Sequence, residues 1–329
     1  MYRSKIAATG SFLPEKKLTN AQIEKMVDTT AEWIEERTGI RERSVADEKD
    51  VTSDLCVRAA NIALERAGLK AEDIDMIIVA TVSGDHLMPS TACMIQAKLK
   101  CRPIFSFDLS AACSGFVYSL SIADQFIKTG MYKNILVFGS EILTRMVNYK
   151  DRNTCILFGD GAGCVILSRN DDEKDPSQIY SSHLFADGQL GHLLEFKAGG
   201  SMHPISPKVF EQELQYINMK GKEVFKNAVR TLVECAQTAL ETNHVDLKDL
   251  NWFIPHQANL RITEAVGKHF GIPMEKVVNT ISYTGNTSAA SIPIALDHAV
   301  TDGRIQRGDL VLLSAFGAGL TSGSALLRF

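Results

Sequence analysis

The sequence predicts an α/β fold built from two similar halves, and three observations support this prediction. Helix-like and strand-like patterns alternate along the chain, and strand-like runs such as 76–82 (MIIVATV) are apolar throughout, as in sheets covered on both faces. Segment 225–257 repeats the order of segment 55–81, in which a helix leads through a short acidic turn into a strand. Each half then closes with a Gly-rich bend and a strand, at 158–168 and 316–329.

The elements of the first half follow from local periodicity. Apolar residues at helical spacing predict helices, continuous apolar runs predict buried strands, and a glycine after the last periodic residue ends a helix. On these grounds we expect a helix at 51–68, a strand at 74–82, a strand at 104–109, a helix at 116–127 that ends at Gly130, and a strand at 133–141.

The second half repeats these elements at a nearly constant distance. Asp73 corresponds to Asp249, 176 positions later, and Ile135 corresponds to Leu310, 175 positions later. The polar stretch RNDDEKDPS joins the two parts. We therefore expect two α/β halves that pack face to face. The expected halves are residues 1–172 and residues 173–329.

Composition excludes several function classes. The 329 residues carry a net charge of -4 and are 45% hydrophobic and 22% charged, a globular balance without the basic excess that nucleic acids or anionic membranes attract. No apolar run approaches the ~20 residues of a membrane span. The N-terminus lacks the apolar segment of a signal peptide, so we expect a cytoplasmic protein. The seven cysteines form no CxxC pair, which argues against a disulfide framework or a zinc site.

One cysteine lies at a position that suits a nucleophile. Cys113, in the segment DLSAACSGF (108–116), stands between a predicted strand and a predicted helix, where the helix dipole and free backbone N–H groups favour a thiolate. An offset of 175 residues maps Cys113 onto Ser288, in a second turn of small residues that leads into a helix. Asn286 lies two positions before Ser288, and His256 ends the repeated strand of the second half.

We expect Cys113, His256 and Asn286 to meet across the internal symmetry. A nucleophilic thiol, a histidine that hydrogen-bonds a carbonyl or polarises the thiol, and a neutral asparagine donor suit a reaction in which negative charge develops on an oxygen. Each residue taken alone is more often a packed thiol, a structural histidine or part of a simple turn. The internal repeat therefore carries the argument.

Three long motifs resemble the β-ketoacyl-acyl-carrier-protein synthase III family of thiolase-like condensing enzymes. They are DLSAACSGFVYSLSIADQFI around Cys113, PHQANLRI around His256 and GNTSAASIPIALDHAV around Asn286, and the resemblance covers essentially the whole chain. It implies a thiolase-like fold, an internally duplicated five-layer α-β-α-β-α architecture. It also implies a homodimer that uses acyl-CoA and malonyl-acyl carrier protein (malonyl-ACP) as substrates and no further cofactor.

The resemblance also implies a mechanism. An acyl-CoA primer acylates Cys113, and His256 and Asn286 stabilise the enolate that forms when malonyl-ACP loses CO2. The enolate then attacks the acyl group, so that covalent storage divides one condensation into two steps. The backbone N–H groups of Cys113 and Ala318 correspond to the oxyanion hole of the family.

Further residues match binding positions of the family. The residues matched to CoA binding are Trp33, Arg37, Arg152 and Asn259. The residues matched to carrier-protein binding are Gln257, Arg261, Lys226 and Lys268. Exposed charges of this kind also occur on ordinary solvated helix faces, and rim charges mainly tune association rates.

Some positions depart from the family pattern. Met88 stands where the family often has a phenylalanine that the dimer partner contributes to the acyl pocket, which leaves the primer preference open. Ala318 replaces a common glycine and requires a negative φ. Lys222 replaces an asparagine near the CoA channel, and the long segment 197–215 is a candidate cover for the substrate entrance.

The sequence thus predicts a cytoplasmic synthase III that starts fatty-acid chains from acetyl-CoA or a short or branched acyl-CoA. Two alternatives stay open. One is a related acyltransferase of specialised metabolism, such as polyketide or quinolone priming, and the other is a non-catalytic partner subunit with the same fold. No nucleic-acid or membrane partner is expected.

Overall fold

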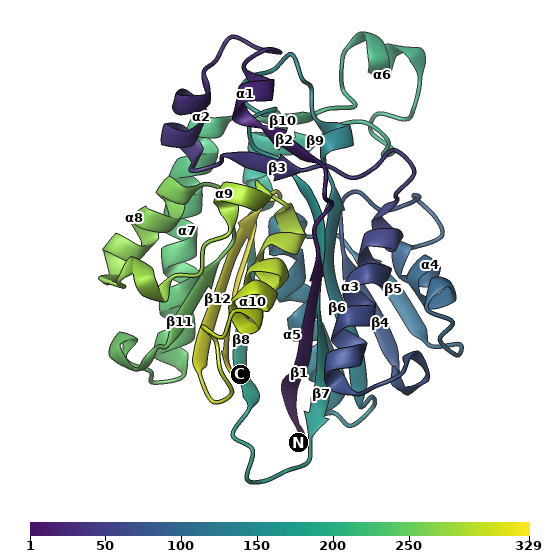
Figure 1. Cartoon of the computed structure of the whole chain (residues 1–329), viewed down its shortest axis with the longest axis vertical. Helices are drawn as coiled ribbons and strands as arrows, with labels where there is room; N and C mark the ends of the chain where they lie inside the picture. Colours follow the sequence, from purple (N-terminus) through teal and green to yellow (C-terminus); the bar gives the residue numbers. More distant parts are fainter.

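The computed structural model describes residues 1–329 and shows five layers (Figure 1). Two mixed β-sheets lie on either side of a central pair of helices, and further helices cover the outer face of each sheet. The predicted five-layer α-β-α-β-α arrangement is confirmed. Because both faces of each sheet are covered, the central strands are buried along their whole length, which explains their continuous apolar runs.

The first sheet contains five strands in the order β1-β7-β6-β4-β5. Their bounds are Arg3–Phe12 (β1), Asp160–Asn170 (β7), Asn134–Ile142 (β6), Met76–Ala80 (β4) and Phe105–Leu109 (β5). β4 pairs in parallel with β5 and β6, whereas β7 runs antiparallel to β1 and β6. α3 (Thr52–Ala67) and α4 (Thr91–Lys98) cover the outer face of this sheet.

The second sheet contains four strands in the order β11-β12-β13-β8. Their bounds are Trp252–Pro255 (β11), Leu310–Gly317 (β12), Thr321–Arg328 (β13) and Gln178–Ala186 (β8). β11 pairs in parallel with β12, and β13 runs antiparallel to β12 and β8. α7 (Gly221–Thr242) and α8 (Leu260–Phe270) cover its outer face.

The short elements gather at the end of the molecule opposite the two termini (Figure 1). They are β2 (Lys17–Thr19), α1 (Asn20–Ile23), α2 (Ala31–Thr38), β3 (Glu42–Ser44), β9 (Leu194–Phe196), α6 (Pro207–Glu211), β10 (Ile217–Met219) and α9 (Ile281–Thr284). β2 pairs with β3, and β9 pairs with β10. None of the helices combines the length and the apolar character that crossing a membrane requires.

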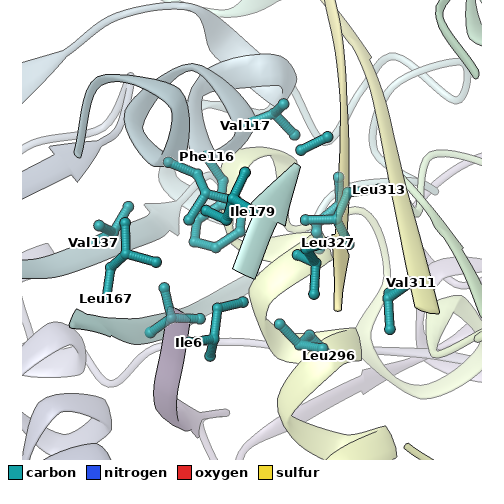
Figure 2. Packing of buried hydrophobic residues seen from close by; sticks show 14 of the residues in the cluster. Ile6, Phe116, Val117, Val137, Leu167, Ile179, Leu296, Val311, Leu313 and Leu327 are labelled. Atoms are coloured by element: carbon teal, nitrogen blue, oxygen red, sulfur yellow. The ribbon is translucent and has the colours of Figure 1, made fainter. Parts of the chain in front are cut away.

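The two halves share one hydrophobic core. The central helices α5 (Gly115–Lys128) and α10 (Ser291–Thr301) join both sheets in a cluster of 26 buried residues. Figure 2 shows Phe116 of α5 and Leu296 of α10 among strand residues such as Val137 and Leu313. The turns that lead into α5 and α10 are therefore held at fixed positions relative to each other.

The helices and strands predicted for the first half are confirmed, with ends that differ by at most two residues. The repeat is confirmed as well, but its offset is 176 at the two central turns. These 3-10 turns begin at Ala112 and Ser288, and both residues adopt a left-handed conformation, with φ of 46° and 49°. Cys113 therefore corresponds to Ala289, and the prediction that it corresponds to Ser288 is wrong by one residue.

The misaligned register has a physical reason. The offset of 175 came from matching the apolar runs of β6 and β12, and both strands are buried at every position. Such strands lack the alternation of apolar and polar residues that fixes a register in a half-exposed strand. Only the tertiary structure, through the matching turns, sets the correct pairing.

Candidate active site

Cys113 lies in the turn between β5 and α5, at the start of the central helix. Its side chain is buried, and burial raises the pKa of the thiol to about 12. The thiol is thus protonated at neutral pH in the substrate-free chain, whereas the helix start alone led us to expect a thiolate. The neighbouring Ser288 side chain opposes this increase in the pKa of Cys113.

His256 follows β11, and its backbone N–H donates to Ser314 O at 2.8 Å. Its Nδ1 lies 2.7 Å from Ser291 Oγ, which also accepts a bond from the Gln257 backbone N–H. This arrangement favours donation from the Ser291 hydroxyl to Nδ1, which leaves the proton on Nε2. Burial lowers the pKa of His256 to about 3, so the imidazole is a neutral donor at physiological pH.

Asn286 is held on three sides. Its backbone N–H donates to Leu157 O, its carbonyl accepts from the Gly159 N–H, and its side-chain Oδ1 accepts from the Ser288 N–H at 2.9 Å. Because Oδ1 is engaged, the side-chain amide presents its Nδ2 hydrogens as donors. The residue is buried and has no titration of its own.

The structure brings all three predicted residues together. Cys113, His256 and Asn286 line one narrow cavity of about 90 Å³, together with Asn259 and Phe225. A cluster that spans residues 113 to 286 in the sequence therefore faces a single space. Two neutral donors lie in the same cavity as the thiol.

Cys113 also lines a second cavity, of about 340 Å³. It is mostly apolar, with Leu143 and Phe158 in its lining, and it also includes Ser288 and Ala318. An apolar chamber beside a nucleophile suits an acyl chain. Phe196 and Ile217, on either side of the long segment 197–215, also line this cavity, whereas no residue of α6 within that segment does.

The loop after β12 reaches the backbone of Cys113. A Cβ at Gly317 would lie 2.7 Å from Cys113 N and 3.0 Å from Ser114 N, so glycine is required for this close approach. Ala318, the next residue, shares the larger cavity with Cys113. Its φ is negative, which satisfies the condition for alanine at this position.

The residues matched to CoA binding form one cluster on the surface. Two guanidinium groups lie near the Trp33 ring, with Arg152 Cζ 5.1 Å and Arg37 Cζ 5.7 Å from the ring centroid. Asn259 caps α8 and donates through Nδ2 to Arg37 O at 3.0 Å. Asn259 also lines the narrow cavity, so it connects the aromatic cluster with Cys113, His256 and Asn286.

Three of the four residues matched to carrier-protein binding are exposed. Lys226 lies on α7, and Arg261 and Lys268 lie on the adjacent helix α8. Gln257, by contrast, is buried, and its side chain bonds only to backbone groups of its own chain, which include Pro255 O and Thr280 N. This burial contradicts the predicted contact between Gln257 and a carrier protein.

Met88 and Lys222 both lie on the surface. Met88 is 86% exposed and lines neither of the cavities beside Cys113 within its own chain. The sequence reasoning missed Glu141, which is fully buried at the end of β6. The sequence signal for Glu141 was a single acidic residue at the end of an otherwise apolar strand, in the segment ILVFGSE.

Comparisons with known proteins agree with this geometry. Residues 107–188 match the family model described as 3-Oxoacyl-[acyl-carrier-protein (ACP)] synthase III, and residues 240–329 match the model of its C-terminal part. A β-ketoacyl-[acyl-carrier-protein] synthase III from Thioalkalivibrio sulfidiphilus is 51% identical over 329 residues, which is 100% of both chains.

Two solved structures show the same fold at full length. The 3-oxoacyl-[acyl-carrier-protein] synthase III of Aquifex aeolicus VF5 is 47% identical, with a TM-score of 0.91 and coverage of 99% of this chain and 100% of that one. The priming β-ketosynthase of the R1128 polyketide pathway is 35% identical, with a TM-score of 0.90 and coverage of 99% and 97%. The chain belongs to the β-ketoacyl-ACP synthase III family, the thiolase-fold acyltransferases that act as condensing enzymes of fatty-acid biosynthesis.

Proposed function

We propose that this chain condenses an acyl-CoA primer with malonyl-ACP and that Cys113 carries the acyl group between the two half-reactions. The observation that carries the proposal is the single cavity that holds a thiol and two neutral hydrogen-bond donors, Cys113, His256 and Asn286. Cys113 Sγ attacks the primer thioester, and CoA leaves. Covalent storage on the thiol separates acyl transfer from carbon–carbon bond formation.

In the second half-reaction, malonyl-ACP loses CO2 and its thioester carbonyl becomes an enolate. His256 Nε2–H and Asn286 Nδ2–H donate to the enolate oxygen, and both donors are held by bonds on their other side before charge develops. The enolate carbon attacks the acyl carbonyl on Cys113, whose oxygen accepts from the backbone N–H groups of Cys113 and Ala318. Decarboxylation supplies the carbanion, so the cycle balances without a further cofactor.

The binding surfaces support the same substrates. Trp33, with Arg37 and Arg152 near its ring, offers an aromatic and cationic platform for the adenine and phosphates of CoA, and Asn259 links that platform to the narrow cavity. Lys226, Arg261 and Lys268 offer a positive surface for an acidic carrier protein.

A homodimer completes the proposal. β5 is an edge strand of the first sheet, and Phe105 on it is 45% exposed next to Phe107 and Phe126. An edge strand with an exposed aromatic cluster is a surface that a second copy can cover. In such a dimer Met88 contributes to the acyl pocket of the partner. All seven cysteines are free, which fits a reducing cytoplasm.

Intact-mass analysis after incubation with a panel of acyl-CoAs tests the proposal. One acyl adduct that maps to Cys113 is expected, and the Cys113→Ala variant should take up none. Cys93 is the one exposed cysteine, so a Cys93→Ser variant serves as the matched control and should keep the adduct. An adduct that persists in Cys113→Ala, or no adduct with any acyl-CoA, contradicts the proposal and favours a non-catalytic role.

The polyketide priming enzyme among the similar structures keeps one second candidate open. The two candidates differ in the acceptor carrier protein and the primer. Acylated protein mixed with radiolabelled malonyl-ACP of fatty-acid synthesis should release labelled CO2 and form a β-ketoacyl-ACP. Turnover only with the carrier protein of a polyketide pathway would favour specialised priming.

A further inference from the structure

The proposed oxyanion hole takes its two donors from different parts of the chain. The Cys113 N–H belongs to the turn that leads into α5, whereas the Ala318 N–H belongs to the loop between β12 and β13. Both residues line the larger cavity. Such donors stabilise a developing charge best when their positions are fixed beforehand, so the turn and the loop must be held at one spacing.

The loop that carries Ala318 is tightly closed. Gly317 at the end of β12 pairs with Thr321 at the start of β13, so the connection runs only from Ala318 to Leu320. Leu320 and Asp187 exchange two backbone hydrogen bonds, of 2.9 and 2.8 Å, which fix the loop to the segment after β8. None of the backbone bonds outside the helices and strands is donated by the Ala318 N–H, which leaves this donor for a substrate oxygen.

The Thr321 hydroxyl joins this loop to the turn that carries Cys113. Its Oγ1 donates to Ala111 O at 2.9 Å and also lies 3.1 Å from Ala318 O. One hydrogen can be shared between two carbonyl oxygens in a three-centre bond. The Ala111 carbonyl also accepts from the Ser114 N–H at 3.1 Å, so it is a fixed part of the turn. A single hydroxyl therefore links the residue of one donor with the turn of the other.

Two further contacts hold the turn against these strands. The Ser114 hydroxyl donates to Thr321 O at 3.1 Å, and Ser114 is fully buried. A Cβ at Gly317 would lie 2.7 Å from Cys113 N and 3.2 Å from Thr321 Oγ1, so the glycine allows all three groups to approach one another. Thr321 thus contacts the turn through both its hydroxyl and its carbonyl.

The β-sheet does not need the Thr321 hydroxyl. Thr321 pairs with Gly317 of β12 and with Ala186 of β8 through its backbone. A β-branched residue without a hydroxyl, such as valine, suits a strand equally well. The two carbonyl groups beside the hydroxyl, those of Ala111 and Ala318, both lie outside the strands. The hydroxyl therefore serves the turn and the loop.

The side chain of Thr321 is held in one orientation. A side chain that branches at Cβ has few accessible χ1 rotamers. The Thr321 Cγ2 methyl lies beside Gly319, where an added Cβ would be 2.9 Å from it. With the methyl in that place, Oγ1 faces Ala111 O and Ala318 O. Threonine thus places the hydroxyl more firmly than serine does.

We infer that Thr321 is a positioning residue that holds the two donors of the oxyanion hole, the Cys113 N–H and the Ala318 N–H, at a fixed spacing. This inference rests on the proposed function. In this role Thr321 donates no hydrogen bond to the substrate and acts through the backbone of the turn and the loop.

The proposed cycle defines which steps depend on Thr321. The primer carbonyl becomes an oxyanion during acylation, and the acyl carbonyl on Cys113 becomes one during condensation, so both steps need the two backbone donors. Decarboxylation of malonyl-ACP instead places its charge on the enolate oxygen beside His256 and Asn286. Loss of the Thr321 hydroxyl should therefore slow acylation and condensation and spare decarboxylation.

The test is the single-turnover rate of Cys113 acylation at saturating acyl-CoA, measured by quenched flow and intact mass. Thr321→Val keeps the branched shape and removes the hydroxyl. It should lower this rate by about 10–100-fold, because a small misplacement of a catalytic group has an effect of this size. The acyl-CoA concentration that gives half of the maximal rate should not change, because the contacts with CoA remain. Thr321→Ser, which keeps the hydroxyl, should stay within about threefold of the wild type.

A decarboxylation assay separates this role from a general loss of structure. In the absence of acyl-CoA, the release of CO2 from malonyl-ACP by Thr321→Val should stay within about threefold of the wild type. Thr321→Ala lacks the hydroxyl and places no methyl against the two carbonyl groups. It should match Thr321→Val in both assays, so it provides the same test if valine unfolds the protein.

Thr238→Val is the matched control. Thr238 is a partly exposed threonine of α7, its hydroxyl donates to Glu234 O at 2.8 Å, and it lines neither cavity beside Cys113. It should leave the rates of acylation and decarboxylation unchanged.

Three results would overturn the inference. They are acylation by Thr321→Val within about threefold of the wild type, acylation by Thr321→Ser that is as slow as by Thr321→Val, and an equal fall of acylation and decarboxylation in the variants without the hydroxyl. Absence of an adduct on wild-type Cys113 instead overturns the proposed function, so the two failures are distinguishable.

Discussion

The two central turns of this protein share a backbone and differ in chemistry. Ala112–Ser114 leads into α5, Ser288–Ala290 leads into α10, and the first residue of each adopts a left-handed conformation. The first turn carries the thiol, whereas the second carries Ala289 at the equivalent position and a serine where the first has Ala112. The duplicated fold thus presents the same turn twice, and only the first copy carries a thiol.

The strands β6 and β12, which lie beside the two turns, also carry different residues at equivalent positions. β6 ends near Glu141, and β12 ends at Gly317, 176 positions later. Gly317 has no side chain, so the amide of Cys113 comes close to β12, whereas Glu141 places a carboxylate against the Ser288 turn. Equivalent positions of the two halves thus hold a close backbone approach at Gly317 and a buried carboxylate at Glu141.

The largest expected effect comes from moving the thiol from the first central turn to the second, which tests whether the two turns are chemically interchangeable. Cys113→Ala should abolish acylation, and adding Ala289→Cys to that variant should not restore it. Ala289 is buried against β6 and lines neither cavity, so a thiol at its position has no access to a thioester. Intact mass measures both variants. An acyl adduct at position 289 would show that the turns are chemically equivalent.

The next effect separates acylation from condensation. Asn286→Ala removes a donor that acts on the enolate, so decarboxylative condensation should fall by about 10²–10³-fold, as for the loss of one oxyanion donor. Acylation of Cys113 should persist, because Asn286 acts in the second half-reaction. Adduct formation and CO2 release from malonyl-ACP measure the two steps. Equal losses in both steps would indicate that Asn286 mainly supports the turn.

The pH dependence of stability should contrast the buried base of the second half with the buried acid of the first. Burial lowers the pKa of His256 from 6.5 to about 3, so as pH falls the unfolded chain binds this proton before the folded chain does. The contribution of neutral His256 to the free energy of unfolding is therefore lost as pH falls below 6.5. Burial raises the pKa of Glu141 from 4.5 to about 7, so its contribution is present below pH 4.5 and is lost as pH rises towards 7.

Urea unfolding of matched variants at pH 5 and pH 7 measures this contrast. Relative to the wild type, the free energy of unfolding of His256→Gln should rise by about 2 kcal/mol when the pH is changed from 7 to 5. That of Glu141→Gln should rise by about 2 kcal/mol, relative to the wild type, when the pH is changed from 5 to 7. Differences from the wild type that do not change with pH would contradict the titration assigned to these two groups.

The smallest expected effect concerns the proposed carrier-protein surface, whose three exposed residues all lie in the second half. Lys268→Glu should raise the KM for malonyl-ACP by about 3–10-fold at low salt and less at high salt, because exposed charges mainly steer association. Lys248→Glu, at a comparably exposed lysine outside the proposed surface, is the control and should leave KM unchanged. Equal effects of both variants would indicate that the KM for malonyl-ACP depends on the net charge of the protein and not on this surface.

Much of the site was predictable because its residues lie in contiguous motifs. Cys113, His256 and Asn286 each stand at the end of an element, and equivalent elements of a duplicated fold bring their ends together. Gln257 was matched to carrier-protein binding by its place in a family motif, and a motif does not report whether a side chain is buried. In this chain its amide instead satisfies backbone groups beneath the site, including Pro255 O and Thr280 N.

By itself, the sequence determined the α/β class, the duplication, the three catalytic candidates and the family, since these rest on local periodicity and on motifs that are read in order. Only the tertiary structure decided the register of the repeat and the burial of Cys113 and Glu141. Uniformly apolar strands leave their register open. The protonation state of a thiol depends on its burial, and only packing buries Cys113.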